Sequence, residues 1–200
     1  MNARSTGLIA ILRGVTPADA VAVAEAIFEA GFDAVEVPLN SPDPLESIRR
    51  IRAAGPAARR VGAGTVLTPD DVLRAADAGA SLIVSPNTRA DVVMETVRLG
   101  LESYPGAATP TEAFAALDAG ARAIKLFPST VVGVDGLRAW ASVLPPGTGL
   151  VPVGGVDTTN LADWARAGAS GAGIGTSLYR PGDAPETVAA RAIRLVEIWR

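Results

Sequence analysis

The sequence predicts a single-domain α/β protein, a (βα)8 (TIM) barrel that covers residues 1–200. Eight short apolar runs without polar alternation lie between helix-like segments, a pattern typical of parallel strands that are covered by helices. Glycines follow the helix-like segments, and the strand–helix unit recurs at a nearly constant interval. An open doubly wound sheet is the alternative. Eight units at a nearly constant interval favour closure into a barrel.

The expected strands are the apolar runs, and all are short enough for a barrel of this size. They are residues 8–12, 34–39, 60–66, 81–85, 101–105, 123–127, 149–153 and 172–175. We expect each helix between them to end at a glycine with left-handed backbone. These glycines are Gly31, Gly55, Gly79, Gly100, Gly120 and Gly168, with Gly147 or Gly149 in the remaining gap.

Three helices are expected to begin at a Thr-Pro pair. The pairs Thr16-Pro17, Thr68-Pro69 and Thr109-Pro110 each have a carboxylate three residues after the threonine. A threonine cap, proline in the first turn and a carboxylate near the positive end of the helix dipole are typical of a helix start. A final helix over residues 185–199 is expected to complete the outer layer.

Composition excludes several classes of function. With 48% apolar and 20% charged residues and a mean hydropathy of +0.29, the chain can bury a large core. A net charge of −3 argues against nucleic acid or an anionic membrane surface as partner. Cysteine and histidine are both absent, which removes thiol and imidazole catalysis and imidazole metal ligands, so no metal is expected. The N-terminal apolar run is too short for a signal peptide, so we expect a soluble cytoplasmic protein.

Lys125 is the only lysine in the chain, and it lies in the middle of the apolar run 123–127. Burial lowers the pKa of a lysine, and a neutral amine is a nucleophile that forms Schiff bases with carbonyl compounds. The alternative is a lysine whose ammonium group reaches an exposed edge of the fold. Both interpretations suit the strand alone, but active sites of barrels lie at the carboxyl ends of the strands, where Lys125 is expected.

Glu36 is a carboxylate in the apolar segment Val35–Leu39, and Arg13 follows the first strand. Burial raises and a neighbouring cation lowers the pKa of a carboxyl group, so Glu36 is a candidate for proton transfer near pH 7. Arg13 offers a planar fork for a substrate carboxylate and a charge that helps keep Lys125 neutral. A structural ion pair between Arg13 and Glu36 is the alternative.

Two glycine-containing segments follow the last two expected strands, at Gly154-Gly155 and Gly175-Thr176. Small residues let backbone N–H groups approach an anion, and these two loops form the usual phosphate site of a barrel. Close packing of helix on strand is the alternative. Three further strand-end residues are candidates for the site. Thr65 could donate its hydroxyl to a carboxylate, Pro86 could form a rigid wall of the site, and Asn40 could form hydrogen bonds with substrate hydroxyl groups.

These residues lie in segments that, in this order, resemble one family across nearly the whole chain. It is the family of 2-keto-3-deoxy-6-phosphogluconate and 6-phosphogalactonate aldolases, which are class I pyruvate aldolases. The matching segments are Ala10-Ile-Leu-Arg-Gly14, Ala34-Val-Glu-Val-Pro-Leu-Asn-Ser41, Gly62-Ala-Gly-Thr-Val66, Ser85-Pro-Asn87, Ile124-Lys-Leu-Phe-Pro-Ser129, Val153-Gly-Gly-Val156 and Gly173-Ile-Gly-Thr-Ser-Leu-Tyr179.

The resemblance implies a role for each candidate. Lys125 becomes the Schiff-base lysine and Glu36 the general acid and base. The expected substrate contacts are Arg13, Thr65 and Pro86 at the pyruvoyl end, Asn40, Phe127 and Val153 along the pocket, and the backbone of Gly154, Gly155, Gly175 and Thr176 at the phosphate. The family commonly has serine where this chain has Thr176, and the hydroxyl group is kept.

Asn40 and Val153 resemble the galactonate branch, because gluconate enzymes typically have an arginine and a threonine at these places. The implied substrate is 2-dehydro-3-deoxy-6-phosphogalactonate, a phosphorylated 2-keto-3-deoxy sugar acid, and the products are pyruvate and glyceraldehyde 3-phosphate. No cofactor is implied, and the family is trimeric. Three alternatives stay open: the C4 epimer as substrate, another barrel lyase or isomerase, and a non-catalytic sugar-phosphate-binding protein.

Overall fold

Parallel strands alternate with helices along the chain in the computed structural model, which describes residues 6–200. The strands are β1 (Gly7–Ile11), β2 (Ala34–Pro38), β3 (Arg60–Gly64), β4 (Leu82–Val84), β5 (Glu102–Tyr104), β6 (Gly106–Ala107), β7 (Ile124–Leu126), β8 (Leu150–Pro152) and β9 (Gly171–Ile174). The helices are α1 (Ala20–Ala30), α2 (Pro44–Ala54), α3 (Pro69–Asp77), α4 (Ala90–Arg98), α5 (Pro110–Asp118), α6 (Ser129–Val143), α7 (Leu161–Arg166) and α8 (Pro185–Trp199). The predicted α/β class and the final helix are confirmed.

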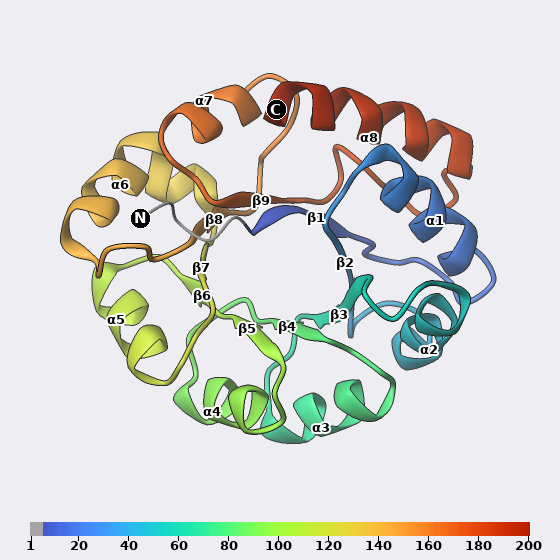
Figure 1. The fold of residues 1–200 in the computed structure, drawn as a ribbon, viewed down its shortest axis with the longest axis horizontal. Coiled ribbons are helices and arrows are strands. Elements are labelled where there is room, and N and C mark those ends of the chain that lie inside the picture. Colours follow the sequence, from blue (N-terminus) through green and yellow to red (C-terminus); the bar gives the residue numbers. More distant parts are fainter. Residues whose placement is uncertain (1–5) are drawn as a thin grey trace.

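The strands form two parallel sheets, with orders β5-β4-β3-β2-β1-β9 and β6-β7-β8. The helices surround the strands, and the first and last helices, α1 and α8, lie side by side (Figure 1). The expected strand over residues 101–105 corresponds to β5, and after Pro105 a second short strand follows, β6, which the sequence did not predict. Proline has no backbone N–H and interrupts a hydrogen-bonded ladder.

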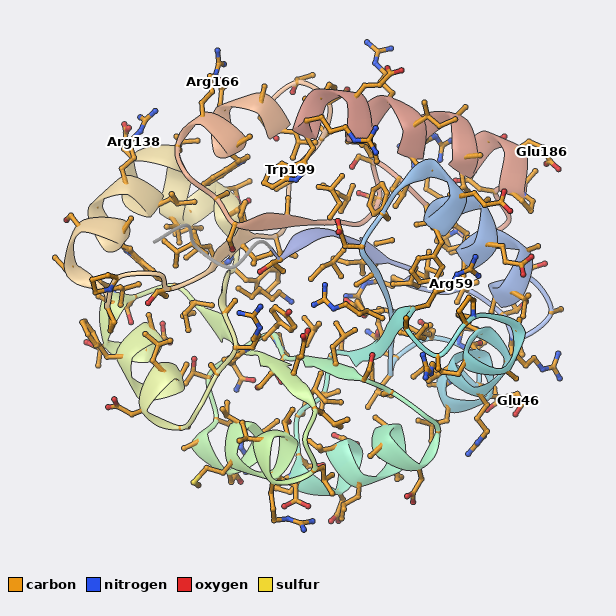
Figure 2. The ribbon with its side chains drawn as sticks, viewed as in Figure 1. Glu46, Arg59, Arg138, Arg166, Glu186 and Trp199 are labelled. Atoms are coloured by element: carbon orange, nitrogen blue, oxygen red, sulfur yellow. The ribbon has the colours of Figure 1, made fainter. Side chains whose placement is uncertain are left out.

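Side chains of each strand alternate between the space enclosed by the strands and the layer beneath the helices. The inner apolar cluster is Ile9, Ile11, Ala34, Leu82, Val84, Tyr104, Ala123, Val151 and Val153. Glu36 follows Ala34 by two residues and Lys125 follows Ala123 by two, so both charged side chains share the inner face. The larger apolar core lies between strands and helices, while Arg138, Arg166 and Glu186 point away from the molecule at its rim (Figure 2).

Two of the three Thr-Pro helix starts are confirmed. Thr68 and Thr109 each form a capping box. In each, the threonine hydroxyl accepts a hydrogen bond from the backbone N–H three residues later, and the carboxylate of that later residue accepts one from the threonine N–H. The prediction at Thr16 is wrong, because α1 begins only at Ala20. The Thr16 hydroxyl donates to the Asp19 carboxylate at 2.7 Å, and the intervening residues form a turn.

Most of the predicted helix-ending glycines have left-handed backbone, with φ from 73° to 105° at Gly31, Gly79, Gly100, Gly120 and Gly168. Gly147, one of the two candidates for the remaining gap, also has a positive φ of 86°. The prediction at Gly55 is wrong, since its φ is −115° and its ψ 168°. Pro56 follows it, and a residue before proline is restricted to extended conformations. None of the described helices is long and apolar enough to cross a membrane.

Candidate active site

A pocket of about 310 Å³ opens at the carboxyl ends of the strands. It is lined by nine of the predicted substrate-site residues and by both predicted catalytic residues, which come from seven strands or from the segments that follow them. These residues are Arg13, Glu36, Thr65, Pro86, Lys125, Phe127, Val153, Gly154, Gly155, Gly175 and Thr176. Asn40 is the one predicted contact that does not line the pocket.

Lys125 lies in the middle of β7 on the inner face and is only 7% exposed. Its backbone is fixed by pairing with Gly106 on one side and Val151 on the other. Burial and the nearby positive charge of Arg13 lower the pKa of Lys125, against an opposing effect of Glu36. The Nζ atom is 4.5 Å from the ring centroid of Phe127, which partly offsets the cost of any charged form.

Glu36 lies in the middle of β2 and is 2% exposed. Burial raises the pKa of Glu36 to about 7, although Lys125 and Arg13 both act to lower it. Its Oε2 atom is buried and has no hydrogen-bond partner among the described residues. A buried acceptor without a partner is costly, and such groups are typical of sites that bind a ligand or water.

Gly64 makes room for this carboxyl group. A Cβ atom at Gly64 would lie 1.7 Å from Oε2 of Glu36, which is shorter than any non-bonded contact. The glycine of β3 therefore decides where the carboxyl group of β2 can lie.

Arg13 turns its guanidinium toward Asn40, with 2.6 Å between Nη1 and Oδ1. No ion pair joins Arg13 to Glu36 among the described residues. The structure therefore does not contain the ion pair that was the alternative interpretation of Glu36. Asn40 contacts Arg13 instead of the pocket, so it holds the arginine at the pocket's edge.

Thr65 lines the pocket with a positive φ of 56°, in the left-handed region that residues with a branched Cβ rarely adopt. Strained backbone of this kind costs about 1–3 kcal/mol and is concentrated at functional sites. Pro86, after β4, forms the adjoining wall.

The opposite end of the pocket is formed by the loops after β8 and β9. Gly154 and Gly155 both have left-handed backbone, with φ of 92° and 79°. Asp157 and Ser177 line this end as well, and the sequence prediction did not include them. Their positions directly after the two glycine segments were the available signal. Ile11, Val156 and Gly173 complete the lining and were also missed.

The arrangement brings a lysine of lowered pKa and a carboxyl group of pKa about 7 into one pocket. An amine that loses its proton easily attacks a carbonyl carbon. A carboxyl group that titrates near neutral pH can both give and take a proton. The geometry therefore suits Schiff-base chemistry on a carbonyl compound that carries an anionic group.

Comparison with known proteins agrees with this chemistry. The family model of the KDPG and KHG aldolases matches residues 2–191. The 2-dehydro-3-deoxy-6-phosphogalactonate aldolase of Escherichia coli K12 is 48% identical over 96% of this chain and 94% of its own. A 2-dehydro-3-deoxy-phosphogluconate aldolase of Pseudomonas aeruginosa is 35% identical over 74% of this chain and 66% of its own.

A solved structure described as native KDPGal has a TM-score of 0.95 to this chain at 46% identity, and it covers 100% of this chain and 97% of its own. The match therefore extends over the complete fold and the residues that line the pocket. The chain belongs to the KDPG and KHG aldolase family.

Proposed function

We propose that this protein is a class I aldolase that cleaves 2-dehydro-3-deoxy-6-phosphogalactonate into pyruvate and glyceraldehyde 3-phosphate. The buried Lys125 beside Glu36, in a pocket at the strand ends, is the observation that carries the proposal. The 48% identity to an aldolase of that name supports the choice of substrate. Pyruvate, glyceraldehyde 3-phosphate and the phosphorylated keto-acid are then its small-molecule partners.

Lys125 is the nucleophile in this proposal. Its neutral amine attacks the C2 ketone of the substrate and forms a carbinolamine, which takes a proton from the Glu36 carboxyl group and loses water to give an iminium ion. Burial lowers the pKa of Lys125 from its usual value, which supports the role because only the unprotonated amine can attack. The iminium then accepts the electron pair of the C3–C4 bond as that bond breaks.

Glu36 is the proposed general base and acid. It takes the proton of the C4 hydroxyl as the C3–C4 bond breaks, and glyceraldehyde 3-phosphate leaves with a new aldehyde group. The protonated carboxyl group then supplies a proton to C3 of the enamine, and water hydrolyses the resulting iminium to pyruvate and free Lys125, with the released proton returning to Glu36. A pKa of about 7 supports both directions of transfer near neutral pH.

The two ends of the pocket suit the two anionic ends of the substrate. Arg13, Thr65 and Pro86 are proposed to contact the pyruvoyl carboxylate, to which a planar guanidinium can donate two parallel hydrogen bonds. The backbone of Gly154, Gly155, Gly175 and Thr176 is proposed to hold the phosphate. The positive φ of both Gly154 and Gly155 supports this, because such backbone lets N–H groups converge on an anion.

Discrimination at C4 is assigned to the middle of the pocket. Val153 and Phe127 line it there, and Asn40 acts through Arg13. Gain or loss of one hydrogen-bonded hydroxyl changes kcat/KM strongly only where a buried polar partner is left unpaired. Val153 offers no such partner, which is why the opposite epimer is a useful test substrate.

The two parallel sheets are proposed to form one closed eight-stranded barrel. An isolated parallel bridge between Val153 and Gly173 connects the end of β8 with β9. At the other junction only Pro105 separates β5 from β6, and its carbonyl accepts the Lys125 N–H at 2.9 Å. Counting β5 and β6 as one interrupted strand supports the predicted topology, in a single domain of residues 1–200.

A homotrimer is proposed from the family resemblance. Large apolar side chains are exposed on one sector of neighbouring helices, among them Leu73 of α3, Met94 and Val97 of α4 and Phe114 of α5. Exposed apolar surface of this kind is typical of contacts between subunits. The cytoplasmic location expected from the sequence stays a prediction.

Comparison of kcat/KM for the two C4 epimers tests the proposed substrate. We expect a clear preference for the galactonate compound, with pyruvate released in proportion to substrate consumed. A preference for the gluconate compound would instead assign the chain to the epimeric reaction. Tight binding of either compound without release of pyruvate would contradict the enzyme proposal and favour a binding protein.

A further inference from the structure

Three successive carbonyl groups after β8, those of Gly154, Gly155 and Val156, each accept a hydrogen bond from a side chain. The donors come from three separate parts of the fold: the first residue of α6, the turn before α7 and the loop after β9. The bonds run from Ser129 Oγ to the Gly154 carbonyl (2.5 Å), from Asn160 Nδ2 to the Gly155 carbonyl (2.7 Å), and from Ser177 Oγ to the Val156 carbonyl (2.9 Å).

Two of these donors lie outside the pocket. Ser129 is 1% exposed, and neither Ser129 nor Asn160 lines the pocket, whereas Gly154, Gly155 and Val156 do. The carbonyls of Gly154 and Gly155 therefore point away from the pocket, toward the layer behind the loop. Ser177 lines the pocket itself, so its hydroxyl is also placed for direct contact with a ligand.

The direction of a carbonyl fixes the direction of the next N–H, because the peptide unit is planar and trans. Holding the Gly154 carbonyl outward turns the Gly155 N–H inward, and holding the Gly155 carbonyl outward does the same for Val156. Neither N–H donates a hydrogen bond to any residue within the described range 6–200. Two donors are thus left free on the pocket side of the loop.

The inward direction of these two N–H groups is easily lost, because the loop contains two glycines. Gly154 and Gly155 rotate about their backbone bonds more freely than other residues. A rotation of either peptide unit would exchange a free N–H for a carbonyl oxygen, whose partial negative charge repels an anion. The loop therefore needs external contacts to keep its donors inward, and Ser129 and Asn160 supply them.

Both residues have a second contact that stiffens the same loop, Ser129 through its backbone and Asn160 through its side chain. The Ser129 N–H donates to the Val153 carbonyl at 2.8 Å, one residue before Gly154. The Asn160 Oδ1 accepts the Asp157 N–H at 3.0 Å, two residues after Gly155. Ser129 and Asn160 thus hold the two ends of the segment that carries the free donors.

We propose that Ser129 and Asn160 are positioning residues for phosphate binding, which act by fixing the carbonyls of Gly154 and Gly155 so that the N–H groups of Gly155 and Val156 face the substrate phosphate. The inference rests on the proposed function, which places the phosphate at this loop. It assigns no contact with the substrate to either side chain.

The test compares two substrates in wild type, Ser129→Ala and Asn160→Ala: the phosphorylated keto-acid and the same 2-keto-3-deoxy acid without its phosphate. Loss of one carbonyl contact is expected to raise KM for the phosphorylated substrate about tenfold, since each tenfold change corresponds to about 1.4 kcal/mol. The kcat value, and kcat/KM for the unphosphorylated acid, are expected to change less than about twofold.

Binding of inorganic phosphate, measured by calorimetry, is expected to weaken by a similar factor in both variants. Trapping of pyruvate on Lys125 by borohydride is expected to stay at the wild-type rate, because it requires no phosphate. Thr159→Ala is the matched control. Its hydroxyl donates to Asp157 in the same turn and to none of the three loop carbonyls, so phosphate binding should be unchanged.

Equal losses of kcat/KM with both substrates would overturn the inference. Wild-type KM and wild-type phosphate affinity in both variants would overturn it as well. Should Asn160→Ala fail to fold, Ser129→Ala decides alone, because it removes only a hydroxyl group. If wild-type protein traps pyruvate and prefers the phosphorylated substrate, and both variants behave like wild type, only the positioning role is contradicted. Wild-type protein that shows neither property contradicts the proposed function, and the inference with it.

Discussion

At the scale of single residues, two charged side chains occupy positions that an apolar strand normally gives to a valine or leucine. Burial moves the pKa of Glu36 upward to about 7 and the pKa of Lys125 downward, so both titrate closer to neutral pH than in water. Neither forms an ion pair in the described part of the chain. Burying both groups costs folding free energy, and the same burial shifts their pKa values so that both groups react more readily near neutral pH.

Glu36→Gln is expected to change how stability depends on pH. The Glu36 carboxyl has a pKa of 4.5 when exposed and about 7 in the folded chain, so between these values the folded state holds a proton that the unfolded state has released. The free energy of unfolding therefore falls as pH rises through this window, by ~3 kcal/mol in total. Urea unfolding between pH 4.5 and 8 measures it.

Glutamine cannot titrate, so the variant should lack this pH-dependent fall in the free energy of unfolding. It should therefore gain stability relative to wild type as pH rises. Parallel pH profiles for the two proteins would show that Glu36 has an ordinary pKa. Pyruvate trapping by Glu36→Gln provides the check that the pocket is still formed.

Gly64→Ala is expected to lower kcat by at least about tenfold while pyruvate is still trapped on Lys125. The added methyl group would overlap Oε2 of Glu36 and force the carboxyl group to another position. A misplaced proton-transfer group loses much of a contribution of about 10²–10⁴ to the rate. Unchanged kcat with an unchanged melting temperature would mean that the position of Glu36 matters little.

At the scale of elements, helix ends and strand boundaries follow local rules except where a neighbour overrides them. The Thr-Pro pairs at Thr68 and Thr109 start helices with complete capping boxes. The same local pattern at Thr16 forms a turn, and α1 begins four residues after Thr16. A shared sequence pattern therefore has two structural outcomes in this chain.

Thr109→Ala is expected to lower the free energy of unfolding by about 1 kcal/mol, because the first turn of α5 loses its side-chain acceptor. Thr16→Ala is the matched control and should cost less, since its hydroxyl caps no helix. Thermal or urea unfolding of both variants measures the difference. Equal losses would show that the capping box adds nothing beyond an ordinary exposed hydrogen bond.

Much of the fold could be predicted because apolar strands and capped helices are local patterns. The prediction of a left-handed Gly55 was wrong because Pro56 restricts it to extended backbone, and β6 was missed as a separate short strand after Pro105, which lacks an N–H. Glu36 and Lys125 could be identified because a charge inside an apolar run is unusual. Both residues line the pocket, and their catalytic roles stay a prediction.

The remaining site residues carry only a weak signal in the local sequence. Asp157 and Ser177 are small polar residues in loops, and such residues are common on any protein surface. Asn40 was expected in the pocket, but a side chain two residues after its strand turns to Arg13 instead. The roles of Ser129 and Asn160 depend on contacts across 25 and 5 residues, which no local pattern reveals.

At the scale of the whole molecule, the helices surround the strands and cover their outward-facing side chains (Figure 1). The amino-terminal end of the strands is occupied by the Arg60 guanidinium, which donates to Glu102 and to the Tyr104 hydroxyl, both at 2.5 Å. The carboxyl-terminal end is open as the pocket. The Arg60 cluster thus fills one end of the strand layer, and the pocket opens at the other.

The homotrimer predicts a sedimentation mass of three times 20.3 kDa. Phe114→Glu should shift the mass toward one chain, because a carboxylate placed in an apolar contact between subunits is costly to bury. Phe114 is 40% exposed on the outer face of α5, so the single chain should still fold. A wild-type mass of 20.3 kDa would contradict the trimer.

Covalent capture of pyruvate tests the Schiff-base proposal most directly. Wild-type protein is incubated with pyruvate and borohydride and then weighed by mass spectrometry, with Lys125→Met as the matched variant. We expect wild-type protein to gain the mass of one reduced pyruvate, located on the peptide that contains Lys125, and the variant to gain none. An unchanged wild-type mass, under conditions in which a control class I aldolase is captured, would contradict the proposed mechanism.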